Sequence, residues 1–328
     1  MTTVFYHKAD LDGKASAAFI AKALYKRGDL SRTKFVGVDY DCQPDHTTID
    51  GPVIMVDFAL QPFDNIVELA KILDRQNFGF LWIDHHASAI REYIKIGATK
   101  QLLITPILDF VSTLPGVTPQ KRLAACELTA LYFDQKEFYA LARLLGRYDV
   151  GDDSSGWEEY VLPFQMGVES LSIRFSLPDW WHFGSEVGRI LGNDKSIIDA
   201  SVEDIFNHAA YGRSIIDVTL DMGRKRLEER AQWAKEVMKN AYETELYGLR
   251  LIAVKSVPGL NSRDFASVYD PERHDAMAYA YQGKDGNGIW TVILYTDKED
   301  IDLSTICKAY GGGGHKNAAG FQCQILPI

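Results

Sequence analysis

The sequence predicts an α/β protein: a doubly wound, mainly parallel sheet, then a smaller α+β domain, with a connector helix joining the two. In the first part of the chain, short β-branched or aromatic runs alternate with segments whose apolar residues recur every three or four positions. In the last part, strand-like runs follow one another around a glycine-rich turn. We expect domains at 1–215 and 247–328, with the connector helix at 216–246.

Strands and helices can be assigned in chain order. The first domain should contain strands at 3–6, 34–38, 53–57 and 80–84, with helices at 14–27 and 63–76 between them. The segment 121–146 is typical of one or two helices, and the charged segment 222–246 predicts the connector helix. Three or four strands should follow, in "YGLRLIAVKS", "HDAMAYAYQGKDGNGIWTVILYT" and "GFQCQIL".

Composition limits the classes of function. The 328 residues are 46% hydrophobic and 24% charged, which is ordinary for a globular protein and longer than one core usually supports. No apolar stretch reaches the roughly 20 residues that cross a bilayer, and no signal-peptide pattern is present, so we expect a cytoplasmic protein without a membrane partner. The four cysteines lack CxxC spacing and are interpreted as small core residues.

The net charge is acidic. A value of −10 argues against a protein that coats long nucleic acid by neutralising its phosphates. An anionic substrate should therefore be small, or held locally by metal ions.

Polar residues follow three of the predicted strands, at the sheet edge where such folds bind ligands. In "HKADLDGKASAA", His7, Asp10 and Asp12 lie in a turn beside Gly13, and two carboxylates with an imidazole suit a divalent ion. The alternative is that Asp12 caps the following helix and Asp10 is merely solvated, and this segment alone leaves both readings open.

Asp57 follows "VIMV", a strand apolar enough to be buried on both faces, where an unpaired carboxylate is costly. It either caps a turn or binds metal. In "IDHHAS", three titratable groups in series would repel or desolvate one another without a cation. Because adjacent strand residues face opposite sides, we expect His85 to face the metal and Asp84 and His86 to point elsewhere, unless the turn rotates them.

Asp149, in "RYDV" at a predicted helix end, is a further candidate whose case depends on the others. Taken together, four carboxylates and two imidazoles favour manganese or a similar ion over a zinc–thiolate site. Two such ions about 3.5–4 Å apart could clamp a phosphodiester and activate water. The candidate ligands are His7, Asp10, Asp12, Asp57, His85 and Asp149.

A second motif lies near the C-terminus. The glycines of "GGGGHKNAAG", residues 311–320, can let backbone N–H groups surround phosphate oxygens. A flexible hinge is the alternative.

The segments "HKADLDG", "VIMVDF", "IDHHAS", "RYDV" and "GGGGHKNAAG", in this order, closely resemble the signatures of the DHH–DHHA1 phosphoesterase superfamily. The resemblance implies a catalytic DHH domain and a substrate-gripping DHHA1 domain around a dimanganese cleft. One metal would take His7 and Asp10 and the other Asp12, His85 and Asp149, with Asp57 bridging. At His7 the sequence departs from the family, because many members place this histidine two or four residues before the first aspartate, not three.

The resemblance also implies roles around the metals. Asp84 would orient its neighbours, and His86 would contact phosphate and stabilise charge during the reaction. Substrate contacts would come from the glycine loop and residues near it, and for Arg263 a solvated loop arginine is the competing interpretation. The implied substrate contacts are Arg263, Gly312, Gly313, Gly314, His315 and Asn317.

We therefore expect a phosphodiesterase that hydrolyses short oligonucleotides or linear dinucleotides to nucleoside monophosphates, as nanoRNase-type (oligoribonuclease-like) relatives do. It should use two divalent ions, with Mn²⁺ as the first choice and Mg²⁺ or Co²⁺ as alternatives. A single-strand DNA exonuclease, a phosphatase of 3′-phosphoadenosine 5′-phosphate (pAp) and a cyclic-dinucleotide phosphodiesterase remain alternatives, as does a nucleotide sensor without turnover. The sequence leaves open whether the chain forms a homodimer and whether the aromatic segment 157–183 packs or stacks bases.

Overall fold

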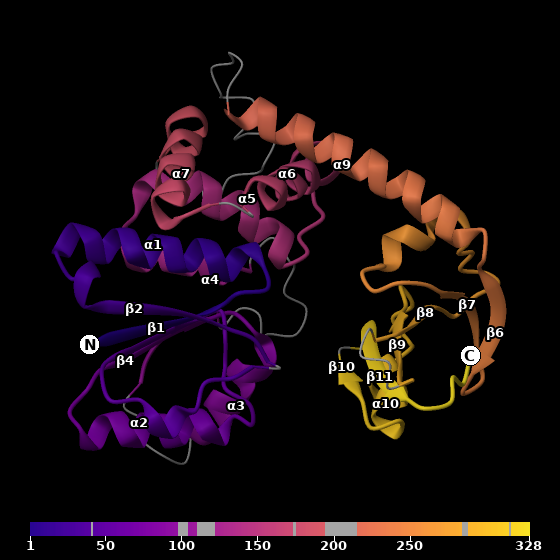
Figure 1. The fold of residues 1–328 in the computed structure, drawn as a ribbon, viewed down its shortest axis with the longest axis horizontal. Coiled ribbons are helices and arrows are strands. Elements are labelled where there is room, and N and C mark those ends of the chain that lie inside the picture. Colours follow the sequence, from indigo (N-terminus) through magenta and orange to yellow (C-terminus); the bar gives the residue numbers. More distant parts are fainter. Residues whose placement is uncertain are drawn as a thin grey trace. The chain divides into compact units, whose positions relative to one another are not determined.

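A computed structural model describes residues 1–40, 42–97, 104–109, 122–172, 175–193, 215–283, 288–314 and 316–328. The chain forms two compact units, Met1–Lys225 and Arg226–Ile328. Figure 1 shows the elements of each unit.

The first unit is built on a parallel sheet in the order β2-β1-β3-β4-β5. Neighbouring positions on its strands face opposite sides, as Val4 and Phe5 do, and both sides are buried. The parallel sheet predicted from the strand–helix alternation is thus confirmed. Its strands are β1 Thr2–His7, β2 Thr33–Val38, β3 Val53–Val56, β4 Phe80–Asp84 and β5 Thr105–Leu108.

Helices cover both faces of this sheet (Figure 1). On one face, α1 (Leu11–Arg27) and α4 (Ala125–Tyr132) pack with Val4 and Ile83 of the sheet. On the other, α2 (Asp64–Arg75) and α3 (Ala87–Gly97) pack around the fully buried Trp82.

Further helices follow: α5 Tyr139–Asp149, a π-helical turn Trp157–Val161, α6 Leu162–Ser172, α7 Leu177–Leu191 and the first part of α9 Ile215–Met238. Single 3₁₀ turns occur at Leu30–Arg32, His46–Thr48 and Lys136–Phe138, and the second unit has a six-residue 3₁₀ helix at Ser262–Ser267.

The aromatic residues between α5 and the end of α7 pack into the first unit. Trp157, Phe164, Trp180 and Phe183 are all buried, and the half-buried Trp181 donates its indole N–H to the carbonyl of Ala18 at 2.8 Å. In the described part of the segment 157–183, these rings are therefore core residues and not a surface for stacking bases.

The second unit contains a mixed sheet in the order β10-β11-β9-β8-β7-β6, with β7 and β8 parallel and the other pairs antiparallel. Helix α10 (Leu303–Ala309) packs on one face through Leu303 and Cys307. This is the second, α+β domain that the sequence predicts. The strands are β6 Tyr242–Leu246, β7 Leu249–Lys255, β8 Ala276–Gln282, β9 Trp290–Tyr295, β10 Gly313–Gly314 and β11 Ala318–Cys323.

Three expectations need correction. The charged segment 222–246 is not helical throughout, because α9 ends at Met238 and Tyr242–Leu246 is a strand whose side chains alternate between half-buried and exposed. The strand predicted at 53–57 ends at Val56. Cys42 is exposed at a turn, whereas Cys126 and Cys307 are buried as predicted.

Among the described residues, no helix is both long and apolar enough to cross a membrane.

Candidate metal centre

The strand order reverses between β1 and β3. The chain leaves β1 toward β2 on one side and later adds β3 on the other, and ligands of open α/β sheets bind outside the strand ends at such a reversal. His7 is the last residue of β1, and Asp57 follows the last residue of β3. Their side chains meet there, with His7 Nδ1 lying 3.6 Å from Asp57 Oδ2.

His7, Asp10 and Asp57 form the first group of converging side chains. The Nδ1 atom of His7 lies 2.5 Å from Asp10 Oδ2. Asp10 is the N-cap of α1 and accepts a hydrogen bond from Gly13 N–H at 2.9 Å, which fixes its carboxylate. A Cβ on Gly13 would lie 2.1 Å from the carbonyl oxygen of His7, so only glycine lets the first turn of α1 approach β1 this closely.

Asp12, His85 and Asp149 form the second group. The Nε2 atom of His85 lies 3.0 Å from Asp149 Oδ2 and 3.6 Å from Asp12 Oδ2. Asp149 is the last residue of α5, which brings its carboxylate to the sheet edge.

Asp57 lies between the two groups. Its Oδ2 faces His7, while its Oδ1 lies 3.4 Å from His85 Nε2. The residue adopts φ 54°, in the left-handed region, where aspartate is tolerated better than most side chains. The two oxygens of one buried carboxylate thus face different ligand groups.

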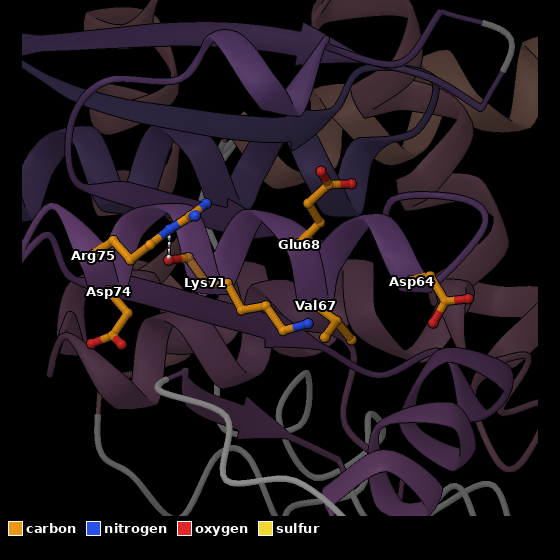
Figure 2. Close-up of a pocket in the computed structure, with 6 residues that line it drawn as sticks. All are labelled: Asp64, Val67, Glu68, Lys71, Asp74 and Arg75. Atoms are coloured by element: carbon orange, nitrogen blue, oxygen red, sulfur yellow. Dashed lines mark hydrogen bonds between the residues drawn. The ribbon is translucent and has the colours of Figure 1, made fainter.

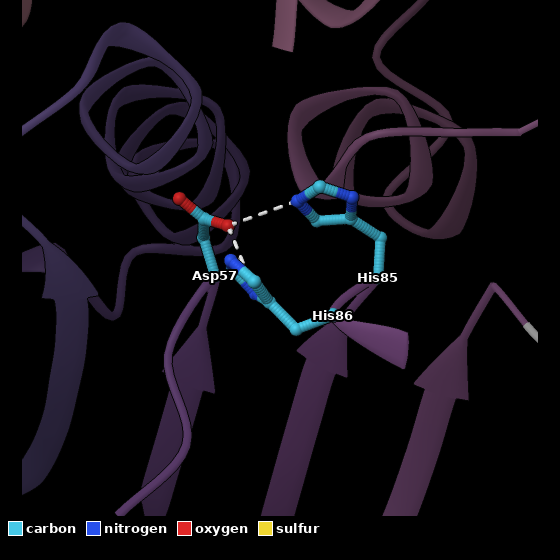
Figure 3. A group of neighbouring side chains, drawn as sticks. All are labelled: Asp57, His85 and His86. Carbon is cyan, nitrogen blue, oxygen red and sulfur yellow. Dashed lines mark ion pairs between the residues drawn. The ribbon is translucent and has the colours of Figure 1, made fainter. Parts of the chain in front are cut away.

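His86 also reaches this centre (Figure 3). Its Nδ1 lies 3.8 Å from Asp57 Oδ1, and the His85 and His86 rings are 4.6 Å apart. The turn after β4 therefore rotates His86 toward the centre, which is the exception that the sequence left open. Strand β4 ends at Asp84, so the alternation of a strand no longer applies to the two histidines.

Asp84 holds this turn in place. One oxygen of its fully buried carboxylate accepts hydrogen bonds from the backbone N–H groups of His85 and His86, at 2.7 and 3.1 Å, and lies 2.7 Å from His86 Nδ1. Although burial opposes it, the charge of His86 keeps the pKa of Asp84 below its usual value.

The donor set fits divalent ions. His7 Nδ1, His85 Nε2 and both carboxylate oxygens of Asp57 are buried and make no regular hydrogen bond. Buried polar atoms almost always make regular hydrogen bonds, so several that converge on one place without any are the arrangement expected of a cation site. Imidazole nitrogens and carboxylate oxygens suit Mn²⁺ and similar ions.

The pKa values of the site favour its protonated forms. The carboxylates of Asp10 and Asp57, which lie close to the ring, raise the pKa of His7 to about 10. Burial raises the pKa of Asp12 and of Asp57, and the charges of nearby aspartates add to the effect. Burial alone would lower the pKa of His85, but its bonds with Asp149 and Asp57 raise it well above the usual value.

The N-terminus of α4 orients Asp12. The two carboxylate oxygens accept hydrogen bonds from Ala125 N–H at 2.9 Å and Cys126 N–H at 2.6 Å. Asp12 therefore does not cap α1, and the cap is Asp10, so the alternative reading of this segment is wrong for both residues. Glu127, which accepts from Ala124 N–H and pairs with Arg143, braces the same turn of α4.

Sequence reasoning missed two residues beside the centre. Asp39 and Tyr40 follow β2 directly, at the same sheet edge as His7. Asp39 Oδ1 lies 3.6 Å from His7 Nε2, the ring nitrogen that faces away from Asp10. Ligands of open α/β sheets bind outside the carboxyl ends of the strands, and this rule selected the polar residues after β1, β3 and β4. Applied to β2, it would also have selected Asp39 and Tyr40.

The candidate substrate contacts belong to the second unit. Gly312 and Gly314 lie against β11, where a Cβ would come within 2.1 Å of Gly320 O and 2.6 Å of Ala319 Cα respectively. A Cβ on Gly313 would meet open space. Arg263 and Asn317 are exposed, Arg263 in the 3₁₀ helix and Asn317 before β11, and His315 lies outside the described residues.

A separate hollow lies along α2 (Figure 2). It has acidic and basic side chains side by side, and none of its lining residues belongs to the ligand groups above. It is lined by Asp64, Val67, Glu68, Lys71, Asp74 and Arg75.

Comparison with known proteins gives a structural match only. No family model matches the sequence, and a search of curated proteins found no match. Among solved structures, the DHH domain of a member of a ribosomal protein family is 14% identical, with a TM-score of 0.50, over 97% of this chain and 82% of that one.

Two further structures cover most of the chain. The exonuclease RecJ bound to manganese is 14% identical, with a TM-score of 0.48, over 98% of this chain and 85% of that one. A pGpG-specific phosphodiesterase from Vibrio cholerae is 13% identical, with a TM-score of 0.44, over 99% and 92%.

The DHH resemblance predicted from the motifs is thus confirmed at the level of structure: the chain has the fold of the DHH-domain proteins.

Proposed function

We propose that this protein is a two-metal phosphodiesterase that hydrolyses short oligonucleotides or linear dinucleotides to nucleoside monophosphates. The observation that carries the proposal is the position of Asp57: its two carboxylate oxygens are buried, make no regular hydrogen bond, and face two different sets of candidate ligands. Paired metal sites of this kind hydrolyse phosphate esters.

In the proposed site, His7 and Asp10 would hold one divalent ion, Asp12, His85 and Asp149 would hold the other, and Asp57 would contribute to both. Mn²⁺ is the first choice, and Mg²⁺ or Co²⁺ are alternatives, because the set mixes hard carboxylates with imidazoles and contains no thiolate. When bound, such ions lower the pKa of water and neutralise phosphate charge.

The protein's own groups would bind and orient the substrate. Water adds to phosphorus, the bond to the leaving nucleoside oxygen breaks, and that oxygen takes up a proton. His86 is our candidate for stabilising the phosphate charge, because its Nδ1 is tied to Asp84 and its ring is a third exposed. Although burial lowers the pKa of His86, the Asp84 carboxylate raises it overall, which favours the charged ring.

Arg263, the glycines 312–314, His315 and Asn317 are proposed to bind the substrate's phosphate or nucleotide. The net charge of −10 supports a short substrate, since long nucleic acid usually needs a basic surface.

Asp57→Asn tests the proposal. Asparagine has the same size and tolerates the left-handed backbone, so the fold should persist. We expect manganese-dependent hydrolysis of a dinucleotide to fall by more than the roughly 100-fold that loss of an outer-shell metal partner costs. Asp74→Asn, an exposed acid on α2, is the matched control and should behave like the wild type.

The assay should include oligonucleotides of graded length, pAp, a cyclic dinucleotide and single-stranded DNA, each with MnCl₂. Fastest turnover of two- to five-residue substrates supports the proposal. Preference for one of the other substrates would replace it with that activity. No product from any of them, with nucleotide binding retained, would indicate a sensor.

A further inference from the structure

We infer that Tyr40 is a stacking platform for the nucleobase next to the scissile phosphate. This inference rests on the proposed function and extends it by naming a residue that binds the base. The residue lies in "VDYDC", directly after β2, and belongs to none of the ligand groups.

Tyr40 lies at the edge of the metal centre. Its ring centroid is 5.8 Å from that of His7, with the two planes tilted by 57°. Tyr40 as a whole residue is nevertheless 42% exposed, although large aromatic residues are usually well covered. An exposed aromatic ring within van der Waals range of a phosphate-binding centre is in reach of the nucleoside attached to that phosphate.

The ring is held from behind. It packs against the fully buried Phe58, with centroids 4.9 Å apart. Phe58 directly follows Asp57 in the chain, so the segment that carries the central carboxylate also supports the Tyr40 ring.

The backbone of Tyr40 is fixed as well. Asp39 Oδ1 accepts a hydrogen bond from Tyr40 N–H at 2.8 Å, and Asp39 and Cys42 form a β-bridge that closes the turn. A rigid, exposed ring binds a base with little loss of side-chain entropy, and each base offers a π-face regardless of sequence. This suits an enzyme that acts on short substrates of any sequence.

The test compares Tyr40→Ala, Tyr40→Phe and Tyr40→Trp with the wild type. Each protein is assayed on an intact dinucleotide and on the same dinucleotide with one of its two bases replaced by hydrogen, first one base and then the other. For the intact dinucleotide, Tyr40→Ala should raise KM roughly tenfold or more with kcat little changed, while the Phe and Trp variants stay near the wild type. With the relevant base removed, the wild type should already show the KM of the Ala variant.

Tyr25→Ala is the matched control. Tyr25 is 60% exposed near the far end of α1, about 20 Å along the helix from its first turn. Its KM should equal that of the wild type.

Manganese affinity is measured in parallel. A loss of manganese affinity in Tyr40→Ala would show that the ring merely supports His7 and would overturn the inference. The inference would also be overturned if Tyr40→Ala raised KM equally for the intact and the base-free substrates, or if it left KM unchanged for both. Absence of turnover in the wild type would overturn the proposed function together with this inference. If the wild type turns the dinucleotide over but Tyr40→Ala behaves like it, only the inference fails, so the two failures are distinguishable.

Discussion

At the residue scale, Asp84 shows how a side chain outside the proposed ligand set can fix the positions of two histidines of the candidate centre. Its carboxylate accepts hydrogen bonds from the backbone N–H groups of His85 and His86 and also contacts Nδ1 of the His86 ring. Without these bonds, the turn after β4 has no buried acceptor for its N–H groups, and such groups are costly to leave unpaired.

Asp84→Asn should therefore weaken the centre without removing a proposed ligand. We expect manganese affinity and kcat to fall roughly 10- to 100-fold, the usual effect of losing an outer-shell partner, because the amide loses the charge that holds His86. Isothermal titration with MnCl₂ and dinucleotide turnover measure the two effects. Asp50→Asn, an exposed acid, is the control. Unchanged affinity and turnover in Asp84→Asn would contradict the orienting role.

At the scale of elements, the parallel sheet could be predicted because several of its strands are apolar runs that end before polar residues, as the fully buried "VIMV" does. The second sheet was predicted less completely: β10 is two glycines with no strand signal, and β6 was absorbed into a charged helical pattern. Their pairing partners lie elsewhere in the chain, and local patterns do not contain that information.

That the candidate ligands lie near one another could be predicted, because the ends of parallel strands share one edge. The identity of Asp10 as the helix cap, and the anchoring of Asp12 by α4, could not be predicted. The second depends on a contact between residues more than 110 positions apart, which only the folded chain reveals.

The glycine loop of the second unit offers a test in which packing and substrate binding separate. Gly312→Ala should lower the free energy of unfolding by about 1–3 kcal/mol, because its Cβ would overlap the backbone of β11. Gly313→Ala meets open space, so its stability in urea unfolding should stay near the wild type. If the loop binds substrate phosphate as proposed, Gly313→Ala should still raise KM for the dinucleotide. A normal KM in that stable variant would contradict the proposed role of the loop.

At the scale of the whole molecule, the ligand groups couple stability to pH. His7 has its pKa raised to about 10, and that of His85 is also raised, so the folded, metal-free protein holds protons that the unfolded chain releases near pH 6.5. Their contribution to stability is complete below pH 6.5 and is lost as pH rises toward 10. The raised pKa values of Asp12 and Asp57 act in the same direction, whereas the lowered values of Asp10 and Asp84 matter only in acid.

Divalent ions compete with these protons, so they should bind more tightly as pH rises and stabilise the protein more. We expect the increase in Tm on adding a fixed concentration of MnCl₂ to be larger at pH 8.0 than at pH 6.5, and titration in buffers of different ionisation enthalpy to show proton release on binding. Asp57→Asn should lose most of the increase at both pH values, while Asp74→Asn should keep it. An increase in Tm that is equal at the two pH values, or larger at pH 6.5, would mean that the metal does not displace the protons of this centre.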